Sequence, residues 1–307
     1  MQRITIITPS YNQVAFLEQA IQSVLAQDYP SIEYIIVDGN SSDGSLQVIQ
    51  KYAHRLAWWV SEPDTGQAEA INKGMRHASG EYVAWLNSDD LYLPGAVAGA
   101  IDALERNPAI GMVFGDALTI DAEGAQLNRL VFGDWGLEEL MGFRIICQPS
   151  VFMRRNVFHQ AGDLDPTYHY LLDHHLWLRI ARLAPIQYVP SSWAAARHHP
   201  GAKNVSQASG FGQEAFRILE WMECQPDLAV LVNRRRRRIE AGAYRLNARY
   251  LLDGGQPAPA LRSYFQALWR SPGFTLRHWR RMLYAAAVLL GGKPLAESYQ
   301  RRRMQTH

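Results

Sequence analysis

Two adjacent carboxylates at the end of an apolar run are the side chains of this sequence best suited to chemistry. Val83–Leu86 lacks the strict alternation of a half-exposed strand, which predicts a strand buried on both faces. Asn87, Ser88, Asp89 and Asp90 follow it at once. In open α/β sheets, ligands bind beyond the carboxyl ends of the strands, where a cation would stabilise two neighbouring carboxylates. The acidic pair therefore predicts a site for Mn2+ or Mg2+, which also bind the oxygens of a diphosphate.

A different interpretation of these four polar residues stays open. Serine and aspartate are favoured N-cap residues, and a helical pattern is expected from Leu91 to Arg106. On this interpretation, Asn87–Asp90 would only begin that helix and would bind no ligand.

A second acidic loop follows an earlier apolar run. Asp38, Asn40 and Ser42 are spaced like the first three ligands of a calcium-binding loop. However, Asp43 and Ile49 stand where an EF-hand needs glycine and glutamate, so that site is excluded. A carboxylate at a strand end can accept a hydrogen bond from a nucleobase N–H. The other possibility is that Asp38 and Asp43 only shape the turn.

These loops need a sheet that brings the strand ends together, and the apolar periodicity predicts one. Runs of strand-forming residues are followed by turn residues and helical patterns in a repeating unit, which predicts an α/β fold with a mostly parallel sheet flanked by helices. The expected strands are Arg3–Thr8, Tyr34–Val37, Trp58–Val60, Glu81–Leu86, Met112–Gly115, Ser150–Met153 and Ile186–Val189, with a hairpin around residues 121–124. The expected helices are Phe16–Leu25, Ser45–Tyr52, Ala68–His77, Leu91–Arg106 and Leu171–Leu183.

The carboxyl-terminal part of the chain has a different character. Residues 197–212 are rich in Gly, Ser, His and Asn, which predicts a loop, and from Glu214 onward the pattern is helical. Ala258–Leu268 and Arg277–Leu290 are expected to form a helical pair. We therefore predict an α/β domain over residues 1–215 and a basic helical region over residues 216–307.

The charge is distributed unevenly along the 307 residues. Residues 1–220 hold 15 Lys/Arg and 24 Asp/Glu, whereas residues 221–307 hold 16 and 5. The basic runs Arg234–Arg238 and Arg301–Arg303 could be a solvated helix face or could attach to anionic lipid headgroups. Nucleic acid is a less favoured partner, because no RNA-binding motif accompanies the charge.

Compartment can be predicted from what the sequence contains. The amino terminus has no pattern of a secretory signal, and the late apolar run Met282–Leu290 is much shorter than a bilayer span. Cys147 and Cys224 are far apart in the sequence and fit a reducing compartment better than a disulfide scaffold. A cytoplasmic protein is expected.

Four motifs in order resemble the amino-terminal half of a family 2 glycosyltransferase with the GT-A fold. They are Thr8-Pro9-Ser10-Tyr11-Asn12, Val37–Gly44, Asn72-Lys73-Gly74 and Asn87-Ser88-Asp89-Asp90. The resemblance continues through Gln148-Pro149-Ser150, Asp173 with Leu176–Arg179, and Arg197-His198-His199. It covers residues 3 to 215 and does not explain the basic tail.

The resemblance implies a role for each matching residue. Asp173 matches the catalytic base, and Asp38 the residue that contacts the nucleobase. The implied metal ligands are Asp89, which stands in the place of the family's DXD motif, Asp90 and His199. The nucleotide-sugar-binding residues would be Thr8, Pro9, Tyr11, Asn12, Asp38, Gly66, Lys73, Asn87 and Ser88.

Two residues depart from the family pattern, and two histidines need a separate interpretation. Asn87 stands where many members have Asp, and Glu69 stands where Asp is frequent, which affects metal affinity and sugar choice. His174 and His175 follow the base, and we expect one to pack and the other to be solvated. Trp177, one turn further on, is expected in the core.

The resemblance implies an inverting, metal-dependent glycosyltransferase. Its donor would be a nucleotide-sugar and its acceptor a saccharide or a lipid-linked saccharide, in polysaccharide assembly at the inner face of a membrane. Two alternatives stay open. The first is a sugar nucleotidyltransferase, which would also use a nucleotide-binding α/β sheet and a metal. Such an enzyme should carry a Gly-rich, basic loop after the first strand, where this chain has Pro9–Asn12. A non-catalytic nucleotide-binding module is suggested by Asn87.

Overall fold

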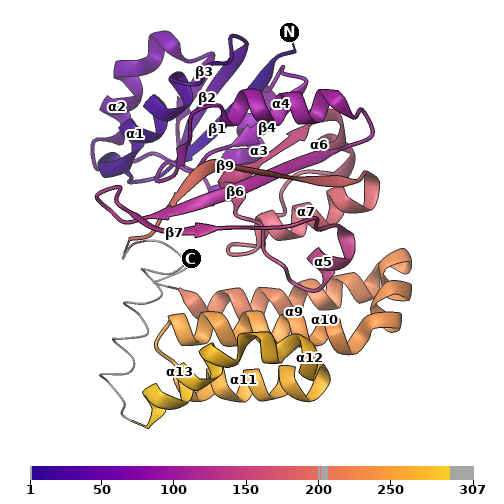
Figure 1. The fold of residues 1–307 in the computed structure, drawn as a ribbon. Helices are drawn as coiled ribbons and strands as arrows, with labels where there is room; N and C mark the ends of the chain where they lie inside the picture. The colour runs from indigo at the N-terminus through magenta and orange to yellow at the C-terminus, as the bar shows by residue number, and fades with distance from the viewer. Residues whose placement is uncertain (1, 200, 202–206, 291–307) are drawn as a thin grey trace. The chain divides into compact units, whose positions relative to one another are not determined.

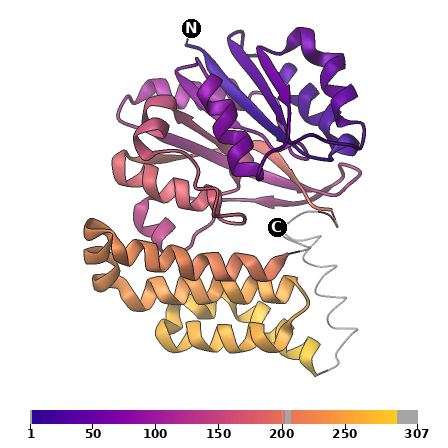
Figure 2. The ribbon, with the colours of Figure 1, turned by 180° about the vertical axis from the view of Figure 1, so that it is seen from behind.

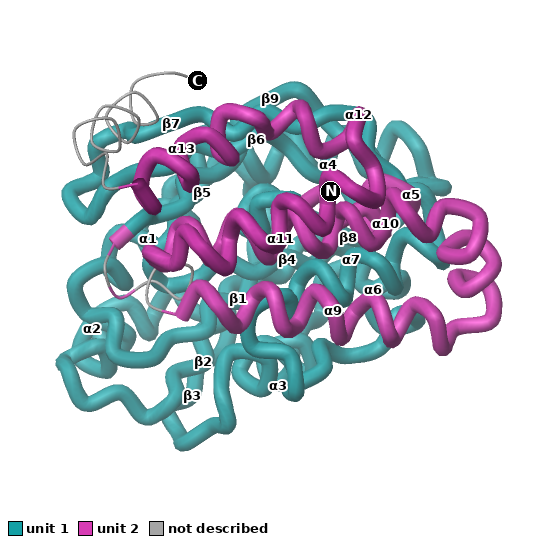
Figure 3. Tube along the Cα trace, turned by 90° about the horizontal axis from the view of Figure 1, so that it is seen from below, with its two compact units in different colours: residues 1–136, 146–198 teal, residues 137–145, 199–307 magenta. Residues whose placement is uncertain are grey.

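The chain forms two compact units. The computed structural model describes residues 2–199, 201 and 207–290. One unit comprises residues 1–136 and 146–198, and the other comprises residues 137–145 and 199–307 (Figure 3). The sequence placed a single boundary near residue 215, and Arg301–Arg303 of the predicted tail lie outside the described residues.

The first unit is built on a mixed β-sheet with helices on both faces. Its strands are β1 (Ile4–Ser10), β2 (Ile32–Asp38), β3 (Trp58–Ser61), β4 (Tyr82–Trp85), β5 (Leu91–Tyr92), β6 (Met112–Ile120), β7 (Gln126–Leu130), β8 (Val151–Arg154) and β9 (Ile186–Arg197). In the described residues they form one sheet in the order β3-β2-β1-β4-β8-β6-β9-β5, with β7 paired to β6 (Figure 1). β1 to β4 are parallel, and antiparallel β8 joins them to the parallel pair β6 and β9.

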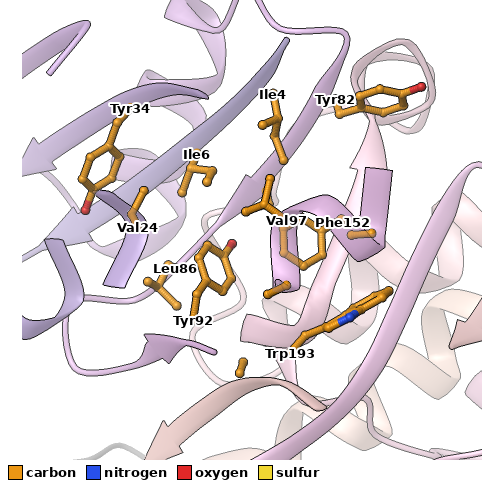
Figure 4. Close-up of a cluster of buried hydrophobic side chains, with 14 of the residues drawn as sticks. Ile4, Ile6, Val24, Tyr34, Tyr82, Leu86, Tyr92, Val97, Phe152 and Trp193 are labelled. Carbon is orange, nitrogen blue, oxygen red and sulfur yellow. The ribbon is translucent and has the colours of Figure 1, made fainter. Parts of the chain in front are cut away.

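The helices between the strands cover the sheet. They are α1 (Val14–Leu25), α2 (Ser45–Tyr52), α3 (Gln67–His77), α4 (Ala96–Arg106), α6 (Arg155–Ala161) and α7 (Leu172–Leu183), with short 3-10 turns at η1 (Ala53–Arg55) and η2 (Gln148–Ser150). α1 and α4 bury Val24 and Val97 against Ile6 and Leu86 on one face of the sheet (Figure 4). α3 and α7 lie on the other face (Figure 2). The predicted α/β architecture, with a central strand buried on both faces, is confirmed.

The predicted helix Leu91–Arg106 is wrong in its first turn. Leu91 and Tyr92 instead form β5, which pairs with β9, and α4 begins only at Ala96. The ring of Tyr92 is buried 5.3 Å from that of Phe152, so packing outweighs the local helical pattern. The N-cap of α4 is Gly95, whose φ of 77° lies in the left-handed region that favours glycine. The acidic tip therefore does not cap this helix, which excludes that interpretation of it.

Two strands are longer than the sequence predicted. β6 continues past Gly115 to Ile120, and β9 continues past Val189 to Arg197, the first residue of the expected loop 197–212. The two strands pair in parallel with a shift of register after Gly115, and Ile120 lies opposite Arg197. The predicted hairpin around residues 121–124 is confirmed by the pairing of β6 and β7. The extra length of β9 brings Arg197 beside this hairpin turn.

The second unit is helical in its described residues. Its helices are α5 (Leu137–Met141), α9 (Ala208–Cys224), α10 (Pro226–Asp253), α11 (Pro257–Arg270), α12 (Pro272–Thr275) and α13 (Trp279–Leu289), with the 3-10 turn η3 (Leu276–His278). Among the described residues, no helix combines the length and the apolar composition needed to cross a bilayer.

The segment 137–145 belongs to the helical unit because it lies directly against α10. A Cβ atom at Gly242 would lie 2.3 Å from the carbonyl oxygen of Gly142, so only glycine permits this approach. Arg245 donates a hydrogen bond to the carbonyl of Phe143 at 2.6 Å. Glu138 and Arg235 form an ion pair at 2.9 Å. These contacts span about a hundred residues of sequence, which explains why local patterns could not reveal them.

His278 lies in a strongly positive part of the second unit. Burial, together with the nearby charges of Arg245, Arg281, Arg144 and Arg249, lowers the pKa of His278 from 6.5 to about 4. The native unit therefore holds this imidazole neutral at pH values at which the unfolded chain would protonate it.

We predict that the stability of the protein falls as the pH drops from above 6.5 towards 4, in part because of His278. As the pH falls, the unfolded chain protonates His278 before the native protein does, which favours unfolding. After allowance for the solvent that still reaches this side chain, the free energy of unfolding should fall by about 1–2 kcal/mol. His278→Gln removes the titration and should lose correspondingly less stability between about pH 7 and about pH 4.5 in urea unfolding. Equal pH dependence in both proteins would contradict the assignment.

Candidate active site

The carboxyl ends of the parallel strands meet at one edge of the sheet. Ser10, Asp38 and Ser61 end β1, β2 and β3 and lie side by side in register. β4 pairs with the other side of β1, so the strand order reverses between β1 and β4. Open α/β sheets bind ligands at such a reversal, just beyond the strand ends. The loops after β1 and β4, which hold Tyr11 and Asp89, flank this position.

Asp38 is buried and holds the loop after β2. Its carboxylate accepts hydrogen bonds from the Ser41 backbone N–H at 2.9 Å, the Ser41 hydroxyl at 2.6 Å and the Ser61 hydroxyl at 2.7 Å. An ionised carboxylate has about four acceptor positions, so one is left for a further donor. Asp38 therefore shapes its turn, while the predicted contact with a nucleobase stays a prediction.

The loop after β1 is tied to the loop after β2. The Asn12 side-chain oxygen accepts a hydrogen bond from the Ser42 N–H at 2.9 Å, and the Asn12 N–H donates to the Ser41 hydroxyl at 2.8 Å. Asn12 has a φ of 50°, a left-handed conformation that asparagine tolerates better than most residues. Tyr11 beside it exposes 63% of its surface. The two loops thus form one framework with an exposed aromatic ring.

Thr8 and Pro9 contribute to this framework from inside the strand. Both are buried in β1. The Thr8 hydroxyl lies 2.9 Å from the hydroxyl of Tyr34 on β2, and burial raises the pKa of Tyr34 above its ordinary value. This contact fixes β1 against β2, and the predicted role of Thr8 and Pro9 in lining a nucleotide site stays a prediction.

The acidic tip after β4 is held by neighbouring amides. The Asn87 side chain donates to Asp90 Oδ2 at 3.1 Å and accepts from the Gln67 amide at 2.6 Å. The backbone N–H of Arg197 donates to Asp90 Oδ1 at 2.9 Å. Burial and the adjacent Asp89 carboxylate hold the pKa of Asp90 well above its ordinary value. Burial and the Asp89 charge thus disfavour the ionised form of Asp90.

Arg197 is buried and connects the tip to two other elements. Its guanidinium lies 4.8 Å from the centre of the Phe16 ring. It donates to four acceptors, which are the carbonyls of Asp89 at 2.9 Å, Asp121 at 3.1 Å and Ala122 at 2.8 Å, and the side-chain oxygen of Gln19 at 2.8 Å. One side chain therefore joins the tip, the β6–β7 turn and α1.

Gly66 is the N-cap of α3, and Lys73 lies two turns further along the same helix. Lys73 on α3 forms an ion pair with Glu62 at 2.7 Å, and only 14% of the Lys73 side chain is exposed. Gly66 precedes α3 with a φ of 132°, and its N–H donates to Asp64 at 2.9 Å. Burial raises the pKa of Asp64. Lys73 is thus a half-buried cation paired with Glu62, and its predicted contact with the nucleotide-sugar, like that of Gly66, stays a prediction.

The predicted base, Asp173, is in the first turn of α7, as the sequence indicated. One turn later, the Trp177 ring stacks on that of Trp85 in β4 with 5.2 Å between the centroids, and both rings are buried. The Gln148 amide donates to the Trp85 carbonyl at 2.7 Å. The stacked pair thus anchors the start of α7 to the strand that carries the acidic tip.

The histidines differ in part from expectation. His174 and His175 are both buried, so the prediction that one of them is solvated is wrong. They precede Trp177 on a helix whose core-facing side is broad, and they pack within it. His199 is also buried and belongs to the second compact unit. Its assignment as a metal ligand stays a prediction.

Comparison with known proteins settles the family. The model described as "Glycosyl transferase family 2" matches residues 5–158, half of the chain. The chain belongs to glycosyltransferase family 2. An uncharacterized glycosyltransferase of Rickettsia conorii is 30% identical over 215 residues, which make up 66% of this chain and 35% of that relative. This family 2 chain therefore spans about a third of the length of that relative.

Solved structures agree on the fold. TarS 1-349 of S. aureus matches with a TM-score of 0.61 and 16% identity, over 89% of this chain and 82% of its own. The mannosyltransferase PcManGT from Pyrobaculum calidifontis, in complex with GDP-Man and Mn2+, matches with a TM-score of 0.61 and 22% identity, over 94% and 86%. The predicted GT-A fold of this family 2 chain, with a helical carboxyl-terminal region, is confirmed.

The side chains at the tip fit one kind of metal site. In the part of the chain that the structure describes, no group of three or more His, Cys, Asp or Glu side chains could hold an ion by itself. Asp89 is half-buried, and Ser88 beside it is buried. Mg2+ and Mn2+ are commonly bound through one or two carboxylates, with substrate phosphates and water as the other ligands. The tip fits a metal held jointly with a diphosphate.

Three residues make contacts that hold the acidic tip in place, and the sequence did not predict these contacts. Arg197 was placed in a loop, although its motif with His198 and His199 was noted. Gln67 and Gln19 belong to no motif of the sequence analysis, and a glutamine on a helix is usually solvated. Both act through partners far away in the sequence, so no local pattern could reveal them.

We predict that Arg197→Lys destabilises the protein by about 2–4 kcal/mol, because an ammonium cannot serve four separated acceptors and leaves buried carbonyls unpaired. Urea unfolding measures this change. Arg106→Lys is the control, since Arg106 pairs with Asp102 on the surface and should change stability by less than about 0.5 kcal/mol. Wild-type stability of Arg197→Lys would contradict the central place of this side chain.

Proposed function

We propose that this chain is an inverting glycosyltransferase that moves a hexosyl or related sugar from a nucleotide-sugar donor to a saccharide or lipid-linked acceptor. The observation that carries the proposal is the joint anchoring of Asp89 and Asp173. The first follows β4, and the second is on the helix tied to β4 by the Trp85–Trp177 stack. A metal-binding carboxylate and a candidate base on a common support suit transfer away from a diphosphate.

Donor binding falls to the framework of the first three strands. Asp38 offers its remaining acceptor position to a nucleobase N–H, and Tyr11 offers an exposed ring for stacking. Thr8 and Pro9 at the end of β1, with Asn12 in the loop that follows, would form the wall behind them. Lys73 would exchange Glu62 for an anionic oxygen of the donor. Gly66 and Ser88 complete this set on the strength of the family motif.

Asp89 and Asp90 would hold Mn2+ or Mg2+ against the diphosphate, and hydrogen bonds from Asn87 and the Arg197 N–H fix Asp90 in the tip. The bound ion would neutralise the charge that develops on the leaving diphosphate. His199 is proposed as a further ligand from the family motif alone. Burial, and then the charge of Asp89, raise the pKa of Asp90, and a bound cation would offset the second of these causes.

Asp173 would accept the proton of the acceptor hydroxyl as that oxygen attacks the anomeric carbon. The C–O bond to the acceptor forms while the bond to the diphosphate breaks on the opposite face, so the anomeric configuration inverts. A carboxylate at the start of a rigid helix keeps its position during this step. Trp177 and Trp85 provide that rigidity by burial and stacking.

The class of donor is supported by the structural neighbours. TarS 1-349 has been solved with UDP-GlcNAc, and PcManGT with GDP-Man and Mn2+. We propose a donor of this class for the present chain. Polysaccharide assembly at the cytoplasmic face of a membrane is proposed from the family motifs and from the basic run Arg234–Arg238.

The proposal predicts that purified protein releases nucleoside diphosphate from one member of a panel of UDP-, GDP- and dTDP-sugars, with lipid extract and oligosaccharides as acceptors. Release should need Mn2+ or Mg2+ and stop with EDTA or in Asp89→Ala. Asp173→Asn should lower kcat by about 10²–10⁴-fold with little change in donor affinity.

Asp102→Asn is the matched control, because Asp102 is an exposed carboxylate in a surface ion pair and should leave turnover unchanged. Metal-dependent binding of a nucleotide without turnover of any donor would favour the binding-module alternative. Full turnover in EDTA or in Asp89→Ala would contradict the metal role.

A further inference from the structure

Two neighbouring helices of the second unit expose rows of large apolar side chains. α11 exposes Phe265 by 60% and Trp269 by 79%, one turn apart. α13 exposes Trp279 by 51%, Leu283 by 59% and, just beyond its end, Leu290 by 87%. The two helices pack together through a small core that includes Tyr264 and Ala285. We name these five exposed side chains, with Arg277 and Arg280, the α11–α13 face.

The face is surrounded by positive charge. Residues 254–290 contain five arginines and no aspartate or glutamate. Two of them pair with carboxylates of α10, Arg270 with Glu240 at 2.6 Å and Arg281 with Asp253 at 4.0 Å, so the positive charge of the face comes mainly from Arg277 and Arg280. Arg270 lies 5.6 Å from the Trp269 ring, and Arg280 lies 5.7 Å from the Trp279 ring. Burial first, and then the charges of Arg245 and Arg281 among others, lower the pKa of the neighbouring His278. Each exposed tryptophan therefore has a guanidinium at its side.

An open hollow lies within the α11 row. This shallow depression is lined by Phe265, Gln266, Leu268 and Trp269, all on α11. Water-exposed indole and phenyl rings at this density are uncommon on a surface that remains in water, and they mark sites of association. The chemistry of the occupant can be inferred from the charges around it.

Charge argues against a second copy of this chain as the occupant. In a two-fold interface each patch meets itself, so Arg277 and Arg280 of the two copies would be brought together, and the face itself holds no carboxylate to offset them. Nucleic acid would satisfy the arginines, but it offers no apolar partner to Leu283 and Leu290. An anionic lipid surface satisfies both, since arginine binds phosphate headgroups while tryptophan and leucine enter the headgroup–acyl boundary.

We propose that the α11–α13 face docks on an anionic lipid bilayer, with Trp269, Trp279 and Leu283 entering the interface and Arg277 and Arg280 contacting headgroups. This assigns the membrane part of the proposed function to a specific surface. It differs from attachment by Arg234–Arg238, because within that run Arg235 and Arg236 already form ion pairs with glutamates. The run is thus partly neutralised.

Co-sedimentation of the full chain with vesicles tests the proposal. Vesicles of equal parts phosphatidylglycerol and phosphatidylcholine should bind the protein at least about tenfold more tightly than vesicles of phosphatidylcholine alone. Raising the salt concentration should weaken binding, because screening shortens the range of the headgroup attraction. No nucleotide is added, so failure of docking is distinguishable from failure of the proposed sugar transfer.

Matched substitutions separate this face from the rest of the surface. Leu283→Ser should weaken binding by about threefold or more, whereas Leu183→Ser on α7, which is exposed by 51%, should not change it. Arg277→Glu in η3 should weaken binding to anionic vesicles, whereas Arg55→Glu in η1 should have no effect. All four side chains are exposed, so urea unfolding should be similar in the four variants and the wild type.

Each outcome supports or overturns the proposal. Selective loss in Leu283→Ser and Arg277→Glu supports docking through this face. Equal loss in the control variants would overturn the assignment to this face. Absence of vesicle binding would also overturn the proposal. In that case, a dimer in light scattering that Leu283→Ser dissociates would identify a second copy as the occupant of the face, and binding of nucleic acid would identify that partner instead.

Discussion

The guanidinium of Arg197 holds the acidic tip after β4 against the β6–β7 turn and α1. Four carbonyl-type oxygens accept from it, and its backbone N–H donates to Asp90. A buried cation is tolerated only when its donors are satisfied and a negative charge is near, and both conditions hold here. Its charge lowers the pKa of Asp90 in part, yet burial and Asp89 keep that pKa raised. The tip is therefore ordered, and its buried Asp90 carboxyl ionises less readily than an exposed one.

The remaining geometry follows from strands that end together. Parallel pairing in register places Asp38 and Ser61 side by side, and the reversal of strand order next to β1 opens a position beside the tip. The Trp85–Trp177 stack then fixes α7, and with it Asp173, to the same sheet. A diphosphate, a metal ion and an acceptor hydroxyl need such shared support, since small displacements of reacting groups are costly in rate.

Much of this arrangement could be predicted from the sequence. The strand ends, the order of the motifs and the helix that begins near Asp173 are local features, and local periodicity revealed them. What failed depends on tertiary contacts. Burial of Tyr92 turned an expected helix start into β5, and contacts with Gly142 and Phe143 joined residues 137–145 to the helical unit. Arg197 could be noted only as part of a motif, because its partners lie far away in the sequence.

The central claim is that the ordered acidic tip, Asp89 and Asp90, binds a divalent cation together with a nucleoside diphosphate. Electron paramagnetic resonance of free Mn2+ tests it most directly, by titration of the protein with UDP or GDP present. UDP and GDP bind some Mn2+ by themselves, so the signal is compared with that of the nucleotide alone. We expect the wild-type protein to lower the free Mn2+ signal below that level, Asp89→Asn to leave it at that level, and Arg197→Lys to bind about tenfold more weakly. If the wild-type protein leaves the signal unchanged with either nucleotide, or if Asp89→Asn binds as tightly as the wild type, the claim is wrong.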